Sequence, residues 1–294
     1  KDLEELIGRL EHVNFIQPPG RHFLGRLRVL QYSFGLHPFG HRHLGKEIFK
    51  DLELWLKLLK RATTGVSLNL LVHRNPTHVY RTDASLHGLG GYSNKGRAWR
   101  FEIPIELRGR ASINLLEFIG TFVSPWVDFL EGNLPPESSI LAKSDNATAS
   151  AWCHKSNFES ELRPTHLKVS RRFAVFLLEA KSQLNNEWLA GRLNQIADSL
   201  SRDYHLPIDT HLALLRAHFP LQIPDGFLIS PLPAEIVSWI NCTLQSLPEQ
   251  AVVSHKWTRS ELVSGIDGLP IWPAWEKPTT TSWKGSMDLP TPLI

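Results

Sequence analysis

Four acidic residues in the middle of the chain could do chemistry. Asp83 lies in the centre of the strand-like segment VYRTDAS, and Asp145 ends a second such segment, ILAKSD. Glu117 stands inside the apolar helical stretch NLLEFIG, and Asp198 stands in the first turns of the helical stretch NQIADSL. Strand and helix faces that are meant for burial rarely hold a carboxylate unless something compensates its charge. Four such residues in one region therefore indicate a shared site for divalent metal ions.

The chemistry that such a site would support is hydrolysis of a phosphodiester. Mg²⁺ prefers oxygen ligands and retains bound waters, and Mn²⁺ is a plausible substitute. Two ions about 4 Å apart can activate an attacking water and neutralise the leaving 3′ oxygen. Because carboxylates a few ångströms apart raise one another's pKa, we expect two bound Mg²⁺ ions both to activate and to stabilise this region.

Each acidic residue also has a purely structural explanation. Asp83, which precedes Ala-Ser, could belong to a turn or a cap, and Glu117 could form a salt bridge with a neighbouring Arg or Lys. Asp145 or the residue after it could cap the following helix, and Asp198 could interact with the dipole of its own helix. Taken singly, the structural explanations are favoured. The combined order of strand, helix, strand end and helix favours the metal site.

The segment 79–205 must position these side chains, and its pattern is that of an α/β domain. Alternating apolar residues predict strands, and apolar residues spaced three and four apart predict helices. The order β-β-β-α-β-α-α-β-α predicts a mixed five-stranded sheet flanked by helices. The expected elements are two strands within 78–94, a strand within 96–104, a helix over 113–130 with Pro125 as a kink or stop, a strand within 138–145, helices over 146–156 and 165–184, a strand over 185–191 and a helix over 193–202.

The segment 1–78 is predicted to be a small helical module, with helices over 1–16, 22–34 and 46–62. From Lys1 to Arg81 there are thirteen Lys and Arg against seven Asp and Glu, a net charge of +6. Such a surface could contact a phosphate backbone or could simply be a solvated basic face.

The segment 206–294 is predicted to begin with helical stretches over 211–217 and 234–247. After about Glu249 the composition turns to Pro, Ser, Thr, Gly and Trp, which is typical of a partly disordered linker, although a docked segment is the alternative.

The bulk composition limits the class of protein. The chain is 42% hydrophobic and 21% charged, and no apolar run or leader pattern predicts a membrane span or a secretory signal. Cys153 and Cys242 lack the spacing of a disulfide framework or a zinc site, which favours an intracellular location, cytoplasmic or nuclear. Because the chain begins at Lys1 and its only methionine is Met287, we expect it to be an internal piece of a longer polypeptide.

The motifs around the acidic residues resemble those of a known family. RTDAS, NLLE, SDNAT and WLAG followed by NQIADSLSR occur in the same order as the signature of retroelement ribonuclease H domains. The forms SDN-x-T and AD-x-LSR most resemble the DIRS and Ngaro type of tyrosine-recombinase retrotransposons. The segment LIGRLEHVNFIQPPGRHFLGRLR resembles the reverse transcriptase thumb and connection of those elements, and KDLELWLKLL resembles the helix before their nuclease domain.

The resemblance implies a ribonuclease H-like fold and a division of roles among the site residues. Asp83, Glu117 and Asp145 would be the core metal ligands, and Asp198 would complete the shell of the second metal and help the product leave. Contacts to the substrate would come from Arg81, Ser85 and Asn146.

The function implied is a metal-dependent endonuclease that hydrolyses the RNA strand of RNA–DNA hybrids within a retrotransposon polyprotein. A reverse transcriptase palm would precede it and a tyrosine recombinase could follow it, but no polymerase activity is expected of this chain alone. The alternative is a catalytically inactive domain of a decayed or domesticated element that only binds nucleic acid or docks.

Two departures from related patterns complete the comparison. A transposase or integrase is disfavoured because Asp198, and not a glutamate, stands on the last helix. Many cellular ribonucleases H also have a histidine shortly before the last aspartate, and the stretch NNEWLAGRLNQIAD has none. Glu187 or solvent would have to substitute for it, or turnover would be slow.

Overall fold

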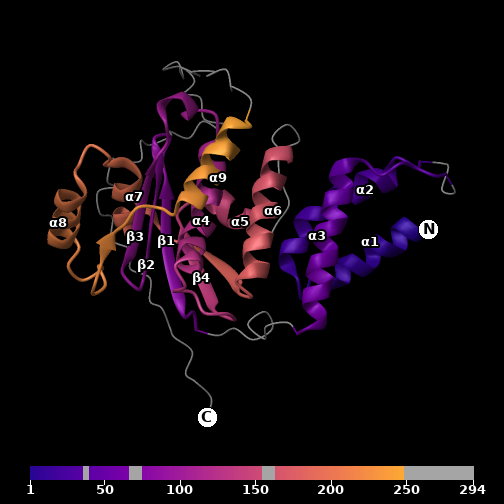
Figure 1. Ribbon diagram of the computed structural model, residues 1–294, viewed down its shortest axis with the longest axis horizontal. Helices are drawn as coiled ribbons and strands as arrows, with labels where there is room; N and C mark the ends of the chain where they lie inside the picture. The colour runs from indigo at the N-terminus through magenta and orange to yellow at the C-terminus, as the bar shows by residue number, and fades with distance from the viewer. Residues whose placement is uncertain (36–39, 66–74, 154–162, 248–294) are drawn as a thin grey trace, which may run out of the picture. The chain divides into compact units, whose positions relative to one another are not determined.

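The computed structural model describes residues 1–35, 40–65, 75–153 and 163–247 (Figure 1). The linker expected after Glu249 lies outside these residues, as does the end of the helix expected over 146–156.

A six-stranded mixed sheet forms the centre of the described structure, in the order β5-β4-β1-β2-β3-β6. The β1–β2 and β2–β3 pairs are antiparallel, whereas the β1–β4, β4–β5 and β3–β6 pairs are parallel. The predicted mixed sheet is confirmed, and its topology is compatible with a ribonuclease H-like fold. The two-residue β6 was not predicted because so short a strand has no periodicity. The strands are β1 His78–Ala84, β2 Gly88–Ser93, β3 Arg97–Glu102, β4 Ser139–Ser144, β5 Gln183–Trp188 and β6 Leu228–Ile229.

Helices cover both faces of this sheet (Figure 1). One face packs against α4 (Ile113–Leu130), α5 (Ala147–Trp152), α6 (Arg163–Glu179) and α9 (Ala234–Gln245), which share one large hydrophobic core. The other face packs against α7 (Gln195–Arg202) and α8 (Ile208–His218) around a smaller core. The predicted arrangement of helices on a mixed sheet is therefore confirmed.

Helix α4 is the central core helix. Its aromatic residues Phe118 and Phe122 pack against Phe173 of α6, with ring centroids 6.0 and 5.5 Å apart. By length and composition alone α4 could cross a membrane, and it is the only such helix among the described residues, but 78% of it is buried inside the protein. This burial is typical of a core helix.

Several boundaries within this domain differ from the predictions. The strand expected over 185–191 begins two residues earlier and is β5, Gln183–Trp188. The helix expected over 165–184 ends at Glu179, because Lys181 adopts a left-handed conformation with φ of 50° and the chain turns into β5 at Gln183. Pro125 lies inside α4 and does not stop it.

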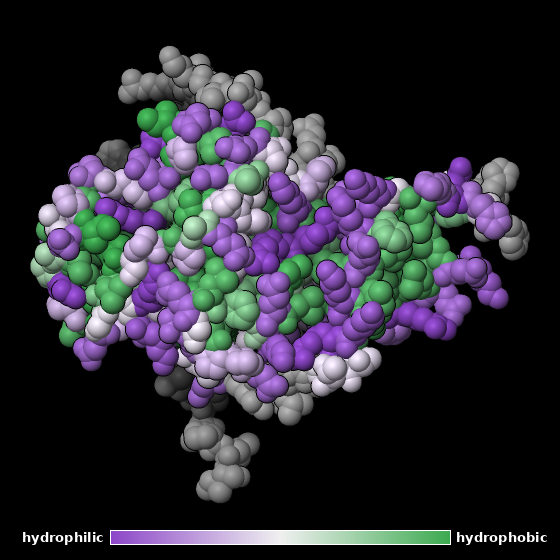
Figure 2. Space-filling model, viewed as in Figure 1, coloured by the Kyte–Doolittle hydropathy of each residue, from purple (hydrophilic) through white to green (hydrophobic). Residues whose placement is uncertain are grey.

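The N-terminal segment is helical, as predicted, and packs on α6. It consists of α1 (Asp2–Val13), a 3-10 turn (Pro18–Phe23), α2 (Gly25–Tyr32) and α3 (Lys46–Thr63), whose apolar core includes Ala174 of α6. The viewed side of this segment carries both hydrophobic and hydrophilic side chains (Figure 2). Hydropathy does not separate basic from acidic side chains, so contact between this segment and a phosphate backbone stays a prediction. The division of the chain at residues 78 and 205 stays a prediction.

A buried ion network joins this segment to α6. Asp51 of α3 is fully buried, and its carboxylate accepts hydrogen bonds from Arg26 of α2 at 2.7 Å and from Arg171 of α6 at 2.6 Å. Two guanidinium groups thus offset one buried carboxylate, which is how proteins ordinarily accommodate such a charge.

Glycines in β2 let α7 lie directly on the sheet. A Cβ at Gly90 would be 2.5 Å from the backbone carbon of Leu200, and a Cβ at Gly88 would be 2.1 Å from the Tyr204 hydroxyl. A Cβ atom essentially never lies so close to a non-bonded atom, so α7 and the residue Tyr204 that follows it could not keep these positions if β2 carried side chains here.

We therefore expect Gly90→Ala to destabilise the protein by at least about 2 kcal/mol, because a backbone atom of α7 cannot move aside cheaply. Urea unfolding followed by circular dichroism measures this loss. Gly8→Ala is the matched control, since Gly8 lies in α1 with no atom within 4 Å of its added Cβ. The control should gain about 0.5–1 kcal/mol from helix propensity. Equal effects from the two substitutions would contradict the close approach of α7.

Candidate metal centre

Three of the predicted acidic residues meet at one edge of the sheet. Asp83, Glu117 and Asp145 each offer a carboxylate oxygen, and these oxygens all lie within 4.8 Å of one another. Asp83 is the second-last residue of β1, not its centre, and Asp145 directly follows β4. Because β1 and β4 are parallel neighbours, their carboxyl ends bring these two side chains together.

Glu117 reaches the same point from α4 and is tied to both strands. Its Oε1 accepts a hydrogen bond from the backbone N–H of Ala84 at 3.1 Å, and its Oε2 accepts one from the Ser144 hydroxyl at 3.2 Å. Glu117 is only 3% exposed, and burial, with the nearby Asp83 charge, raises its pKa to about 8. The salt bridge considered for Glu117 is not found among the described residues.

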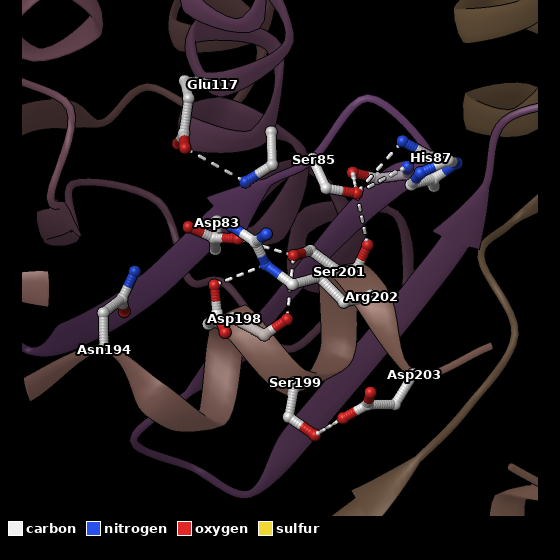
Figure 3. A network of polar contacts seen from close by, with 12 residues as sticks. Asp83, Ser85, His87, Glu117, Asn194, Asp198, Ser199, Ser201, Arg202 and Asp203 are labelled. Atoms are coloured by element: carbon white, nitrogen blue, oxygen red, sulfur yellow. Dashed lines mark hydrogen bonds and ion pairs between the residues drawn. The ribbon is translucent and has the colours of Figure 1, made fainter. Parts of the chain in front are cut away.

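Asp83 is also buried and has one strong partner. The Ser201 hydroxyl of α7 donates to its Oδ2 at 2.5 Å (Figure 3). Burial raises the pKa of Asp83 to about 6, and the charges of Asp145 and Asp198 act in the same direction. The pKa of Asp145 is raised as well, chiefly by burial.

The donor set fits a hard divalent cation. The hydrogen bonds to Glu117 and Asp83 come from neutral donors, and the charge of Arg202 acts on Asp83 without a hydrogen bond, whereas the buried carboxylate of Asp51 has two arginines hydrogen-bonded to it. Buried carboxylates without an adjacent cation are costly, and a bound metal ion would remove that cost. The acidic triad could therefore hold a metal ion, and oxygen ligands favour Mg²⁺ or Mn²⁺.

Asp198 lies beside the triad but is not part of it. Its Oδ1 accepts a hydrogen bond from Arg202 Nε at 2.5 Å, and its side chain is 48% exposed. Helix α7 is fixed below it by buried Asn194, whose side-chain amide donates to the carbonyl of Thr82 at 2.9 Å. The predicted role of Asp198 as a ligand of a second ion stays a prediction.

Two of the predicted substrate contacts are engaged within the protein. Arg81 donates from Nη1 to the Tyr92 hydroxyl at 2.8 Å and does not line the cavity of the triad. Ser85 is buried, and its hydroxyl donates to the carbonyl of Ser201 at 2.7 Å. Contact between either side chain and a hybrid stays a prediction.

The third predicted contact, Asn146, is the N-cap of α5. Its Oδ1 accepts from the backbone N–H of Ala149, and its Nδ2 donates to Asn114 Oδ1, both at 2.9 Å. Asn146 also lines the cavity of the triad, as the prediction requires. Glu187, considered as a substitute for a loop histidine, forms an ion pair with Lys143 at 3.0 Å.

The segment after β5 shapes the site in a way that the sequence did not reveal. Trp188 donates from its indole nitrogen to the backbone carbonyl of Asp145 at 2.9 Å. A Cβ at Gly191 would be 3.0 Å from Asp145 Oδ2, so only glycine leaves this carboxylate its full space. Ser144, Ser201 and Asn194 were likewise missed as supports, and their only signal is that each lies within a few residues of a motif aspartate.

Comparison with known proteins adds little. No family model matches the chain, and no curated protein matches it. Among solved structures, that of the prototype foamy virus protease–reverse transcriptase is 14% identical, with a TM-score of 0.23. The match covers 63% of this chain and 24% of that chain. So low a score carries no argument, and any functional proposal must depend on the site itself.

We expect Mn²⁺ or Mg²⁺ to raise the thermal stability at pH 8, by about 2.7 kcal/mol at a concentration 100-fold above Kd. Asp145→Asn should abolish most of that increase because it removes a ligand. Asp128→Asn is the matched control, since Asp128 is a buried residue of α4 whose carboxylate accepts a hydrogen bond only from the Tyr80 hydroxyl among the described residues. Differential scanning fluorimetry with and without metal measures both. A metal response that survives Asp145→Asn would contradict the site.

Without metal, the stability should fall as pH rises. Folding raises the pKa of Glu117 from 4.5 to about 8, so the folded state favours its protonated form. The stability that Glu117 contributes is therefore complete below about pH 4.5 and is lost progressively up to about pH 8. In EDTA at pH 8, Glu117→Gln should exceed the wild type in free energy of unfolding by something on the order of 3 kcal/mol, and the difference should vanish near pH 5. A difference that is independent of pH in urea unfolding would refute this.

Proposed function

We propose that this chain is a metal-dependent endonuclease that hydrolyses the RNA strand of RNA–DNA hybrids. The observation that carries the proposal is the convergence of the carboxylates of Asp83, Glu117 and Asp145, whose oxygens lie within 4.8 Å of one another. The ordered motifs that surround these residues, which resemble retroelement ribonuclease H domains, support the choice of substrate.

The residues of the chain would divide the work. Asp83 and Asp145, at the strand ends, line an open cavity and would present oxygens both to cations and to an attacking water. Glu117, held from Ala84 and Ser144, would keep its carboxylate in a fixed orientation behind them. Bound Mg²⁺ would supply Lewis acidity and a water of lowered pKa.

The neutral donors around the triad matter for this role. The hydroxyls of Ser144 and Ser201 orient carboxylate oxygens but bring no positive charge that would compete with a metal ion. Nothing in such a site reads bases, so sequence specificity should be weak and recognition should depend on the hybrid backbone and 2′-hydroxyls. The proposal includes an upstream reverse transcriptase palm in the same polyprotein.

The test is cleavage of a labelled RNA–DNA hybrid in Mg²⁺ by wild type, Asp145→Asn and the control Asp128→Asn. We expect the wild type and Asp128→Asn to cut only the RNA strand, and Asp145→Asn to lose about 10²-fold or more in rate. Duplex DNA and duplex RNA of the same sequence should remain intact.

Either of two results would overturn the proposal. A folded wild type that binds the hybrid without cutting it would support the alternative of an inactive binding domain. Cutting that is unaffected by Asp145→Asn would place the activity at another site or in a contaminant.

A further inference from the structure

One guanidinium group lies at the rim of the carboxylate cavity. Among the described residues that line this cavity, three are the carboxylates of the triad and only Arg202 carries a permanent positive charge. Figure 3 shows its guanidinium group pointing from α7 toward the carboxylates of Asp83 and Asp198. A phosphate that binds in this cavity would therefore lie in a lining that includes Arg202.

Most of the donors of Arg202 are unused in the described structure. Its Nε donates to Asp198 at 2.5 Å, and neither of its Nη atoms forms a hydrogen bond with the described residues. A guanidinium group has five N–H donors, so four remain. By contrast, Arg100, which also packs near α7, donates from both Nη atoms to the carbonyls of Asp203 and Leu206 at 3.1 and 2.8 Å.

The ion pair between Arg202 and Asp198 contributes too little to stability to explain why an arginine lies at the rim of the cavity. Both side chains are about half exposed, at 55% and 48%, and they stand four residues apart on one helix. Exposed pairs of this kind contribute little to stability. The pair is better explained by a positioning role, in which Asp198 orients the planar guanidinium group of Arg202 across the mouth of the cavity.

We propose that Arg202 binds the non-bridging oxygens of the phosphate that is to be cut. This inference rests on the proposed function and adds a substrate-contacting residue to it. Two parallel N–H donors match two phosphate oxygens, and a guanidinium group suits this geometry better than an ammonium group. The positive charge would offset the repulsion that the three carboxylates of the triad exert on an incoming phosphate, and Arg202 forms no hydrogen bond with those three carboxylates among the described residues.

The test compares Arg202→Gln and Arg202→Lys in the full chain, by hybrid cleavage at saturating Mg²⁺ and by Mn²⁺ binding without nucleic acid. We expect Arg202→Gln to lower kcat/KM by about 10²-fold, as for loss of one charged donor to a reacting group. Mn²⁺ should bind it as tightly as wild type or more tightly, because a positive charge has been removed. Arg202→Lys should recover part of the rate.

The matched control is Arg9→Gln. Arg9 forms the same kind of exposed pair, with Glu5 four residues away on α1, and it lines no part of the cavity. It should leave both cleavage and metal binding unchanged, so a general effect of lost charge can be recognised.

Three outcomes decide the proposal. Unchanged cleavage by Arg202→Gln would overturn it while leaving the nuclease activity of the wild type established. Parallel loss of Mn²⁺ binding and cleavage would also overturn it, because Arg202 would then only support the metal site. If the wild type does not cut, the measurement that decides is the salt dependence of hybrid binding, taken as the slope of log binding constant against log salt concentration. A slope that is smaller in magnitude by about 1 in Arg202→Gln than in wild type supports a phosphate contact, and an unchanged slope refutes it.

Discussion

The clustering of three carboxylates, of which Asp83 and Glu117 are buried and Asp145 is half-buried, is the constraint on which this structure depends. Asp83, Glu117 and Asp145 are held within 4.8 Å, where their charges disfavour one another and burial disfavours each. Among the described residues, the hydrogen bonds to Asp83 and Glu117 come from hydroxyl and backbone donors, whereas those to Asp51 come from arginines. The charge of Arg202 acts on Asp83 and Asp145 without a hydrogen bond. The site thus keeps a negative charge that a bound divalent cation could neutralise. Without a bound cation, this charge lowers the free energy of unfolding of the chain.

The rest of the domain provides the rigidity that holds these groups against their repulsion. The parallel pair of β1 and β4 fixes two carboxylates at adjacent strand ends, since register leaves no freedom to slide apart. Helix α4 fixes the third, because the fully buried Phe118 and Phe122 prevent the helix from turning Glu117 away. Glycines in β2 bring α7 close enough for Ser201 to reach Asp83.

The sequence predicted the α/β class, the order of the first five strands and the meeting of three acidic residues, because apolar periodicity and motif order carry that information. It could not predict the residues that hydrogen-bond the triad. Ser201 is 118 residues from Asp83 in the sequence, and no local pattern around either residue indicates their hydrogen bond. It also placed the end of α6 too late, since the left-handed turn at Lys181 is made by a residue that normally favours helix.

Burial of a carboxylate does not by itself indicate a metal site in this protein. Asp51 and Asp128 are as deeply buried as Glu117, yet arginines satisfy one and the Tyr80 hydroxyl satisfies the other. What distinguishes the triad is the distribution of charge around it: neutral donors behind the carboxylates and a single guanidinium group at the mouth. If the proposed function holds, this asymmetry would orient an incoming phosphodiester, because the guanidinium group would attract its anionic oxygens at the rim and metal ions held by the triad would attract them at the base. That polarity arises only in three dimensions, from residues of α4, β1, β4 and α7 that no local sequence pattern joins.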